Sequence, residues 1–119
     1  MKLTEKCKEE FSVWLVCGEG IINFEKYYND RDGSDDPYTW FMELPQSMQY
    51  GVYVDFFDSV GVDLRVDKIF FDEHEWFCCI INRVFINTDN GLPINHFNTR
   101  QEARTEAITK ANEIHNRRN

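Results

Sequence analysis

Residues 76–87 read WFCCIINRVFIN, and this stretch decides the fold class. Neighbouring side chains of a β-strand point to opposite faces of a sheet, and here the residues on both faces are apolar. A strand of this kind must be covered on both faces, so it lies in the middle of a sheet or against a partner. We therefore predict a central strand over about 76–86.

The segment that precedes this strand predicts its first neighbour. From residue 62 the sequence VDLRVD alternates apolar and charged residues, which is typical of a strand with one face in water. We predict this strand over about 62–71. The polar residues DEHE at 72–75 predict a hairpin turn, which would make the two strands antiparallel neighbours.

Turn and strand signals continue after the central strand. TDNG at 88–91 predicts a second turn, and LPINHF at 92–97 is a candidate third strand. Pro93 has no N–H to donate to a neighbouring strand, so it would confine this strand to an edge. The expected sheet is a short antiparallel β-meander.

The C-terminal part of the chain predicts a helix over about 99–116. Thr99 and Glu102 have the spacing of a capping box, which satisfies free N–H groups at the start of a helix. The apolar residues that follow recur at helical spacing and form one narrow stripe: Ala103, Ala107, Ile108, Ala111 and Ile114. Because most of them are small, we expect this helix to lie close to the sheet.

Two more helices are predicted, over about 4–17 and 45–60. Thr4 is expected to cap the N-terminus of the first helix. Pro45 suits the first turn of the second helix, and Gly61 suits the position just after its end. Both boundaries therefore carry a local signal.

The acidic segment 19–43 shows no consistent period, so we predict an irregular conformation, with YTWFMEL at 38–44 as a short extended piece. No internal repeat or linker divides the sequence. We therefore predict one α+β domain over residues 1–119, in which three helices pack a β-meander.

Charge and composition exclude several classes of protein. The 119-residue chain has a formal net charge of -8, which repels nucleic-acid phosphates and anionic lipid headgroups. We therefore expect neither nucleic acid nor a membrane as a general partner. The first residues, MKLTEKCKEEF, are charged where a secretory signal would need an apolar core, so we expect a cytoplasmic protein.

The acidic stretch NDRDGSDDP at 29–37 is a candidate calcium loop. With Gly33 at the sixth position of such a loop, Tyr28 falls at the first position and Thr39 at the twelfth. Neither side chain can supply the carboxylate that a calcium ion needs there. We therefore predict a solvated turn without a bound metal ion.

Zinc takes imidazole and thiolate ligands, and the candidate set here is His74, Cys78, Cys79 and His96. On an extended strand His74 and Cys78 would stand about 13 Å apart, and Cys78 and Cys79 would point to opposite faces. We therefore predict no zinc site. All four cysteines of the chain are expected to be buried free thiols that pack as small apolar groups.

The C-terminal helix and its tail form the one basic region of the chain. Its positive residues, Arg100, Arg104, Lys110, Arg117 and Arg118, are interleaved with glutamates at 102, 106 and 113. Interleaved charges are typical of a soluble helix face with ion pairs three or four residues apart. A local contact with nucleic acid is the less favoured alternative.

Two segments, LPQSMQYGVYVDFFDSVGVDL (44–64) and FNTRQEARTEAITKANEI (97–114), resemble a group of small uncharacterised proteins encoded by phages and prophages of gut bacteria. The resemblance covers about the second half of the chain and leaves the acidic segment outside. It implies provenance rather than activity, and it brings no catalytic or binding residues to this chain.

We expect a non-enzymatic protein that acts through protein–protein interaction, with a host factor or with itself, and that needs no cofactor. Aromatic residues of YYND (27–30) and PYTWF (37–41) are predicted to be exposed beside an acidic rim, which suits a basic patch on a partner. The alternative is a small enzyme or metal-dependent protein. Its site would gather residues from separate segments: Asp30, Asp32, Asp55, Asp58, His74 and His96.

Overall fold

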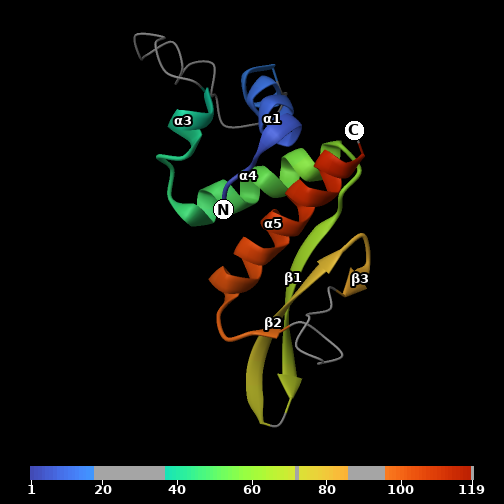
Figure 1. Ribbon diagram of the computed structural model, residues 1–119. Helices are drawn as coiled ribbons and strands as arrows, with labels where there is room; N and C mark the ends of the chain where they lie inside the picture. The colour runs from blue at the N-terminus through green and yellow to red at the C-terminus, as the bar shows by residue number, and fades with distance from the viewer. Residues whose placement is uncertain (18–36, 72, 86–95, 119) are drawn as a thin grey trace.

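The computed structural model describes residues 1–17, 37–71, 73–85 and 96–118. Its elements in chain order are α1 (Glu5–Cys17), α3 (Pro37–Phe41), α4 (Gln46–Ser59), β1 (Leu64–Phe71), β2 (His74–Ile81), β3 (Val84–Phe85), β4 (His96–Phe97) and α5 (Arg100–Arg117). Figure 1 shows α1, α3 and α4 at one end of the molecule, with α5 crossing between them and the sheet. The predicted α+β class, an antiparallel sheet packed by helices, is confirmed.

Strand β2 is the central strand of the sheet, as its two apolar faces predict. It pairs with β1 in antiparallel register from Leu64↔Ile81 to Phe71↔His74. Its other edge pairs with β3 and β4. Cys78 and Cys79 point to opposite faces and are both completely buried, so both faces of the sheet are covered at this level.

The prediction of one strand over 76–86 was wrong in its second half, because the chain reverses direction after Ile81. Asn82 and Arg83 both have positive φ, 53° and 68°, as the central residues of a type I′ hairpin turn require. The N–H of Asp63 donates to Oδ1 of Asn82 at 2.9 Å, and the N–H of Asn82 donates to the carbonyl of Asp63 at 2.9 Å. These bonds tie the turn to the start of β1.

The other predicted turns and the third strand are described only in part. The turn expected at 72–75 is shorter, because His74 and Glu75 already pair with β1. The turn predicted at 88–91 lies outside the described residues. Of the candidate strand at 92–97, the described residues 96–97 form β4, which pairs with β2.

Helix α5 has the predicted cap and the predicted buried stripe. Oγ1 of Thr99 accepts the N–H of Glu102 at 3.1 Å, which is one half of a capping box. The alanines of the stripe and Ile108 are completely buried. Because residue 103 is small, Sγ of Cys79 reaches the carbonyl oxygen of Ala103 at 2.8 Å. The helix therefore lies close to the sheet.

Helix α4 follows Pro45 and ends in a Schellman motif. The N–H of Gly61 donates to the carbonyl of Asp58 at 3.2 Å, and the N–H of Val62 donates to the carbonyl of Phe57 at 2.8 Å. Gly61 has a φ of 84°, a conformation that strains residues with a side chain. The stop predicted from this glycine is confirmed.

Helix α1 is held at its start by side chains of α5, which the sequence near α1 does not predict. Oδ1 of Asn116 accepts the N–H of Cys7 at 2.9 Å, and Oδ1 of Asn112 accepts the N–H of Thr4 at 2.9 Å. The side-chain amide of Asn112 donates to Oγ1 of Thr4 at 2.9 Å, so this hydroxyl is engaged with α5. N–H groups at the start of α1 are thus satisfied by residues 108 and 109 positions away in sequence.

Residues 37–41, PYTWF, form helix α3, which corrects two predictions. This part of the acidic segment is helical rather than extended or irregular, and Tyr38, Trp40 and Phe41 are buried. PYTWF therefore offers no exposed aromatic anchor. Pro37 begins the helix, where a missing N–H removes no helical hydrogen bond.

Phe11 of α1 lies at the centre of an aromatic cluster that joins α1, α3 and α4. Its ring centroid is 4.8–5.9 Å from those of its neighbours Trp14, Tyr38, Phe41, Tyr53 and Phe56. Most of these pairs are tilted or edge-to-face, which the charge distribution of aromatic rings favours. The N–H of Leu3 donates to the hydroxyl of Tyr38 at 2.8 Å, and this hydroxyl is 3.0 Å from that of Tyr53. The buried hydroxyls are therefore satisfied.

The β1–β2 hairpin extends beyond the N-terminal end of α5 (Figure 1). One buried cluster fills the space between the helices and the near end of β1 and β2, and a second joins Cys79 to Ala103 and Ala107. Residues 68–70 and 74–76 belong to neither cluster in the described part of the chain. We call these residues the hairpin tip.

Candidate binding sites

The aspartates and histidines of the predicted catalytic cluster do not meet in the described part of the chain. Asp55 and Asp58 are exposed on α4. His74 lies in the hairpin tip and His96 in β4, whereas α4 is at the opposite end of the molecule from the tip (Figure 1). Asp55 and Asp58 therefore form part of a solvated helix face.

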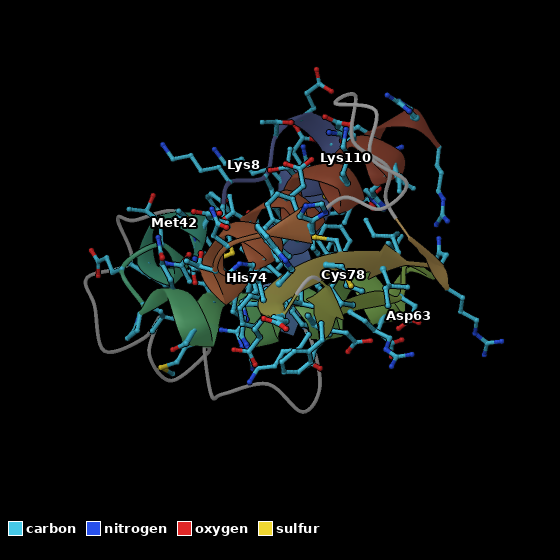
Figure 2. The ribbon with its side chains drawn as sticks, turned by 90° about the horizontal axis from the view of Figure 1, so that it is seen from below. Lys8, Met42, Asp63, His74, Cys78 and Lys110 are labelled. Atoms are coloured by element: carbon cyan, nitrogen blue, oxygen red, sulfur yellow. The ribbon has the colours of Figure 1, made fainter. Side chains whose placement is uncertain are left out.

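Two residues of the candidate zinc set are neighbours, and two are not. Cys78 and His96 lie directly opposite each other in the β2–β4 pair. His74 is further along β2 (Figure 2), and Cys79 faces α5. Within the described ranges, no group of three or more His, Cys, Asp or Glu side chains could hold a metal ion. Asp30 and Asp32, which belong to the candidate calcium loop at 29–37, lie outside these ranges.

Cys7, Cys78 and Cys79 are buried free thiols, as predicted, while the side chain of Cys17 lies outside the described set. Burial, reinforced by the charge of Glu10, raises the pKa of Cys7 to about 12. Burial also raises the pKa of Cys79 to about 12 and raises the pKa of Cys78. Because the thiolate is the reactive form of cysteine, these protonated thiols act as packing groups.

Most of the basic region forms the local contacts that its interleaved charges predict. The ammonium group of Lys110 is 4.0 Å from Glu106 and 3.6 Å from Glu113, and Arg117 is 4.0 Å from Glu113. Arg118 donates to the carbonyl of Val60 at 3.0 Å. Arg100 and Arg104 differ, because neither forms an ion pair with an acidic side chain that the structure describes.

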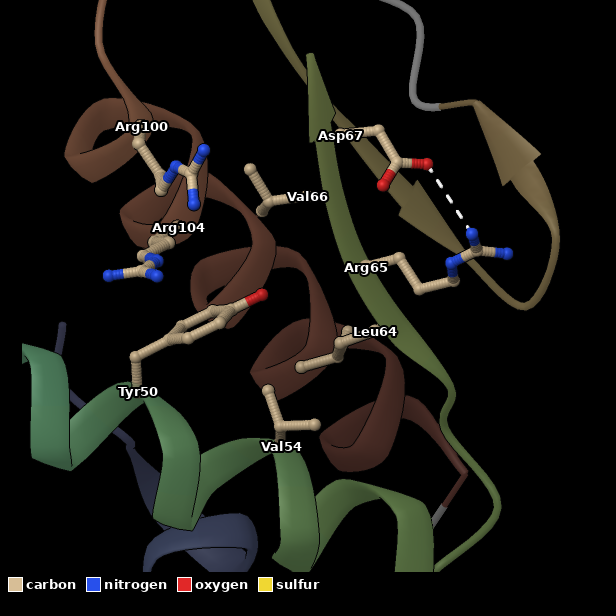
Figure 3. A pocket seen from close by; sticks show the side chains of 8 residues that line it. All are labelled: Tyr50, Val54, Leu64, Arg65, Val66, Asp67, Arg100 and Arg104. Atoms are coloured by element: carbon tan, nitrogen blue, oxygen red, sulfur yellow. Dashed lines mark ion pairs between the residues drawn. The ribbon is translucent and has the colours of Figure 1, made fainter.

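Arg100 and Arg104 line a pocket of about 230 Å³ between α4, α5 and β1, which we call the arginine pocket. Figure 3 shows the two arginines on α5, Tyr50 on α4 and Val66 on β1 around one hollow. The full lining consists of Tyr50, Val54, Leu64, Arg65, Val66, Asp67, Arg100 and Arg104. Sequence reasoning missed this pocket, because its residues come from three separate segments.

The lining of the arginine pocket is positively charged. It contains three arginines and one aspartate, a formal net charge of +2. The guanidinium of Arg65 is 3.5 Å from the carboxylate of Asp67, so these two charges compensate each other. The uncompensated charge is that of Arg100 and Arg104.

Aromatic rings hold both guanidinium groups in place. The guanidinium carbon of Arg104 is 4.8 Å from the ring centroid of Tyr50, and that of Arg100 is 5.3 Å from the ring centroid of Phe77. Nε of Arg104 is buried and has no hydrogen-bond partner among the described residues. Burial raises the pKa of Tyr50, although Arg104 opposes this, so the hydroxyl is neutral and can donate a hydrogen bond.

The hairpin tip is the second candidate site. Phe70 is 78% exposed, more than any other large hydrophobic side chain that the structure describes. It lies opposite Glu75, whose carboxylate is 2.9 Å from the ammonium group of Lys68. Trp76, on the other face of the tip, is half-buried, and its ring centroid is 4.7 Å from that of His96.

Comparison of the chain with protein-family models, with curated proteins and with solved structures finds no match in any of the three. Among the described helices, none combines the length and the apolar character needed to cross a membrane. An α+β fold by itself does not define an activity, so the function depends on the two sites.

Proposed function

We propose that the protein is a non-enzymatic binding protein that docks its hairpin tip onto a partner protein. This proposal rests on one observation. The side chain of Phe70 is 78% exposed, and it lies in a part of the hairpin that belongs to neither buried cluster. In this position Phe70 stabilises the fold very little. Burial of such a side chain by a partner would contribute about 1.5–3 kcal/mol to binding.

The charge around Phe70 favours a partner with a basic surface. Residues 72–75, DEHE, include three acidic residues, and of the described ones only Glu75 is paired, with Lys68. The chain as a whole is also negatively charged, with a formal net charge of -8. Opposite charge on a partner would raise the association rate, and it would favour this partner over acidic competitors.

The proposed partner is a host protein in the cytoplasm of a bacterium. This part of the proposal rests on the resemblance of residues 44–64 and 97–114 to phage and prophage proteins. Such a protein would act by occupying a surface of the host protein. An apolar pocket with a basic rim is the surface that the tip would fit.

The test compares the wild-type protein with Phe70→Ser and with Val13→Ser as a matched control. Val13 is also an exposed apolar residue, 64%, but it lies on α1 at the other end of the molecule. Each protein is immobilised and used to capture proteins from a gut-bacterial lysate at low and at high salt. We expect one basic protein to be retained by the wild type and by Val13→Ser, and to be lost with Phe70→Ser.

Equal retention by Phe70→Ser and the wild type would show that the tip is not the binding surface. Light scattering measures the oligomeric state and therefore detects self-association. A wild-type dimer that Phe70→Ser converts to a monomer would identify a second copy of the chain as the occupant. A monomer that retains no protein at either salt concentration would contradict the proposal.

A further inference from the structure

We infer that the arginine pocket binds a small oxyanion with two negative charges, for which inorganic phosphate is the simplest model. This site is separate from the docking of the hairpin tip and does not depend on it. It lies between α4, α5 and β1, whereas the tip extends beyond the end of α5 (Figures 1 and 3).

The charges of Arg100 and Arg104 are not balanced by the described residues. Arg100 and Arg104 are four residues apart on one helix, where like charges destabilise each other. In a chain with a net charge of -8, both could have acidic partners, yet neither has one among the described residues. A bound dianion would compensate both charges.

The hydrogen-bond donors of the pocket match the acceptors of an oxyanion. A guanidinium group presents a rigid fork of N–H donors, which binds phosphate or carboxylate oxygens in pairs. Figure 3 shows the hydroxyl of Tyr50 directed into the same hollow, where it can add a donor. Arg100 is also the first residue of α5, so the positive end of the helix dipole lies beside the pocket.

Both donors are partly ordered by aromatic rings. The guanidinium carbon of Arg104 is 4.8 Å from the ring centroid of Tyr50 and that of Arg100 is 5.3 Å from the ring centroid of Phe77, so each contact lowers the loss of side-chain freedom on binding. The buried Nε of Arg104 has no hydrogen-bond partner among the described residues, and an oxyanion can accept a hydrogen bond from this group. The volume of about 230 Å³ suits a phosphate group better than a drug-sized ligand.

The experiment titrates the full-length protein with sodium phosphate at low ionic strength and follows backbone amide shifts by NMR. We expect saturable binding with a Kd of about 1 mM or lower, and shifts confined to the start of α5, the middle of α4 and β1. Arg100→Gln should weaken phosphate binding at least about tenfold, because it removes a charged hydrogen-bond donor. The variant should still fold, because Arg100 is exposed and its loss leaves the core intact.

Two further variants separate specific recognition from general charge. Arg117→Gln removes the same charge from the same helix at an 80% exposed position far from the pocket, so we expect unchanged binding. Arg104→Lys keeps the charge and loses the planar fork, so we expect weaker binding in a folded protein. Equal weakening by Arg117→Gln and Arg100→Gln would overturn the proposal, as would the absence of saturation with wild-type protein.

Two more ligands distinguish the sources of the anion. Succinate carries two carboxylates, and binding that is as tight as that of phosphate and equally sensitive to Arg100→Gln would support an oxyanion pocket with carboxylate ligands. A short single-stranded oligonucleotide should bind no more tightly than phosphate, because the remaining surface is acidic. Much tighter oligonucleotide binding with a steep salt dependence would overturn the assignment to a small ligand.

Discussion

The helical end of the molecule and the hairpin tip use the same kind of side chain in opposite ways. Phe11 is completely buried among five aromatic rings, whereas Phe70 is almost entirely in water. Phe70 lies on the same face of β1 as Leu64 and Val66, the face that α5 covers, but it belongs to the tip of the hairpin, which extends beyond the end of that helix (Figure 1). The length of sheet that α5 covers, and not apolarity alone, therefore decides which aromatic residues form the core.

The polar contacts of the helical end also differ from those of the hairpin tip. At the helical end, Asn112, Asn116 and Tyr38 join segments that are far apart in sequence through hydrogen bonds with buried or half-buried groups. At the tip, the ion pair between Lys68 and Glu75 is exposed on both sides, and such pairs contribute about 0–1 kcal/mol. We therefore expect the helical end to hold most of the stability.

The largest effect is expected for Phe11→Ala, which empties the centre of the aromatic cluster. Loss of a buried phenyl ring should reduce the free energy of unfolding by about 3–5 kcal/mol. Urea denaturation followed by circular dichroism measures this change. A loss below about 1 kcal/mol would show that the aromatic cluster is not the main stabilising region of the fold.

A smaller loss, of about 1–2 kcal/mol, is expected for Asn116→Ala, because the N–H of Cys7 at the start of α1 would lose its acceptor. The control is Asn116→Asp, which keeps an acceptor and places a negative charge at a helix N-terminus, where it is favourable. In the same denaturation assay we expect Asn116→Asp to be clearly more stable than Asn116→Ala. Equal stability of the two variants would argue against capping between helices.

Two glycines of the helical end give a matched pair of smaller effects with opposite signs. Gly61→Ala should destabilise by about 1 kcal/mol, because its φ of 84° strains a residue with a side chain. Gly51→Ala should stabilise by about 0.5–1 kcal/mol, because Gly51 is inside α4 and no atom outside the helix backbone lies within 4 Å of an added Cβ. The melting temperatures of both variants, compared with that of the wild type, measure these effects. Two changes in melting temperature of the same sign would contradict the geometry of the α4 terminus.

The parts of the fold that the sequence predicted are those with local signals. Thr99 and Glu102 are three residues apart and mark the start of α5 without any tertiary information. Gly61 marks the end of α4, because positive φ is a property of the single residue. The alternation from residue 62 and the two apolar faces of β2 likewise predicted that β1 and β2 are neighbours and that β2 is central.

The parts that were missed depend on distant residues or on weak local signals. Helix α3 has only five residues, too few for a helical period to show. The turn at Asn82 and Arg83 lacks the glycine that usually marks a type I′ turn. The cap of α1 comes from Asn116, and nothing near Cys7 in sequence indicates this.

The arginine pocket could not be predicted for a related reason. Interleaved glutamates made Arg100 and Arg104 look like members of ordinary helix-face ion pairs, as Lys110 is. Only the fold shows that they are without acidic partners among the described side chains. Arg104 lies over the ring of Tyr50 instead, and Arg100 lies over the ring of Phe77. The pattern of charges in a sequence predicts possible pairs, but not which pairs form.

The most direct test of the division between the two ends is Phe70→Ser, measured for stability and for partner binding in the same preparation. We predict that the free energy of unfolding changes by no more than about 0.5 kcal/mol, because Phe70 is exposed, while capture of the partner protein is lost. A loss of stability of several kcal/mol, comparable to that of Phe11→Ala, would contradict the account, because it would make the hairpin tip part of the folded core.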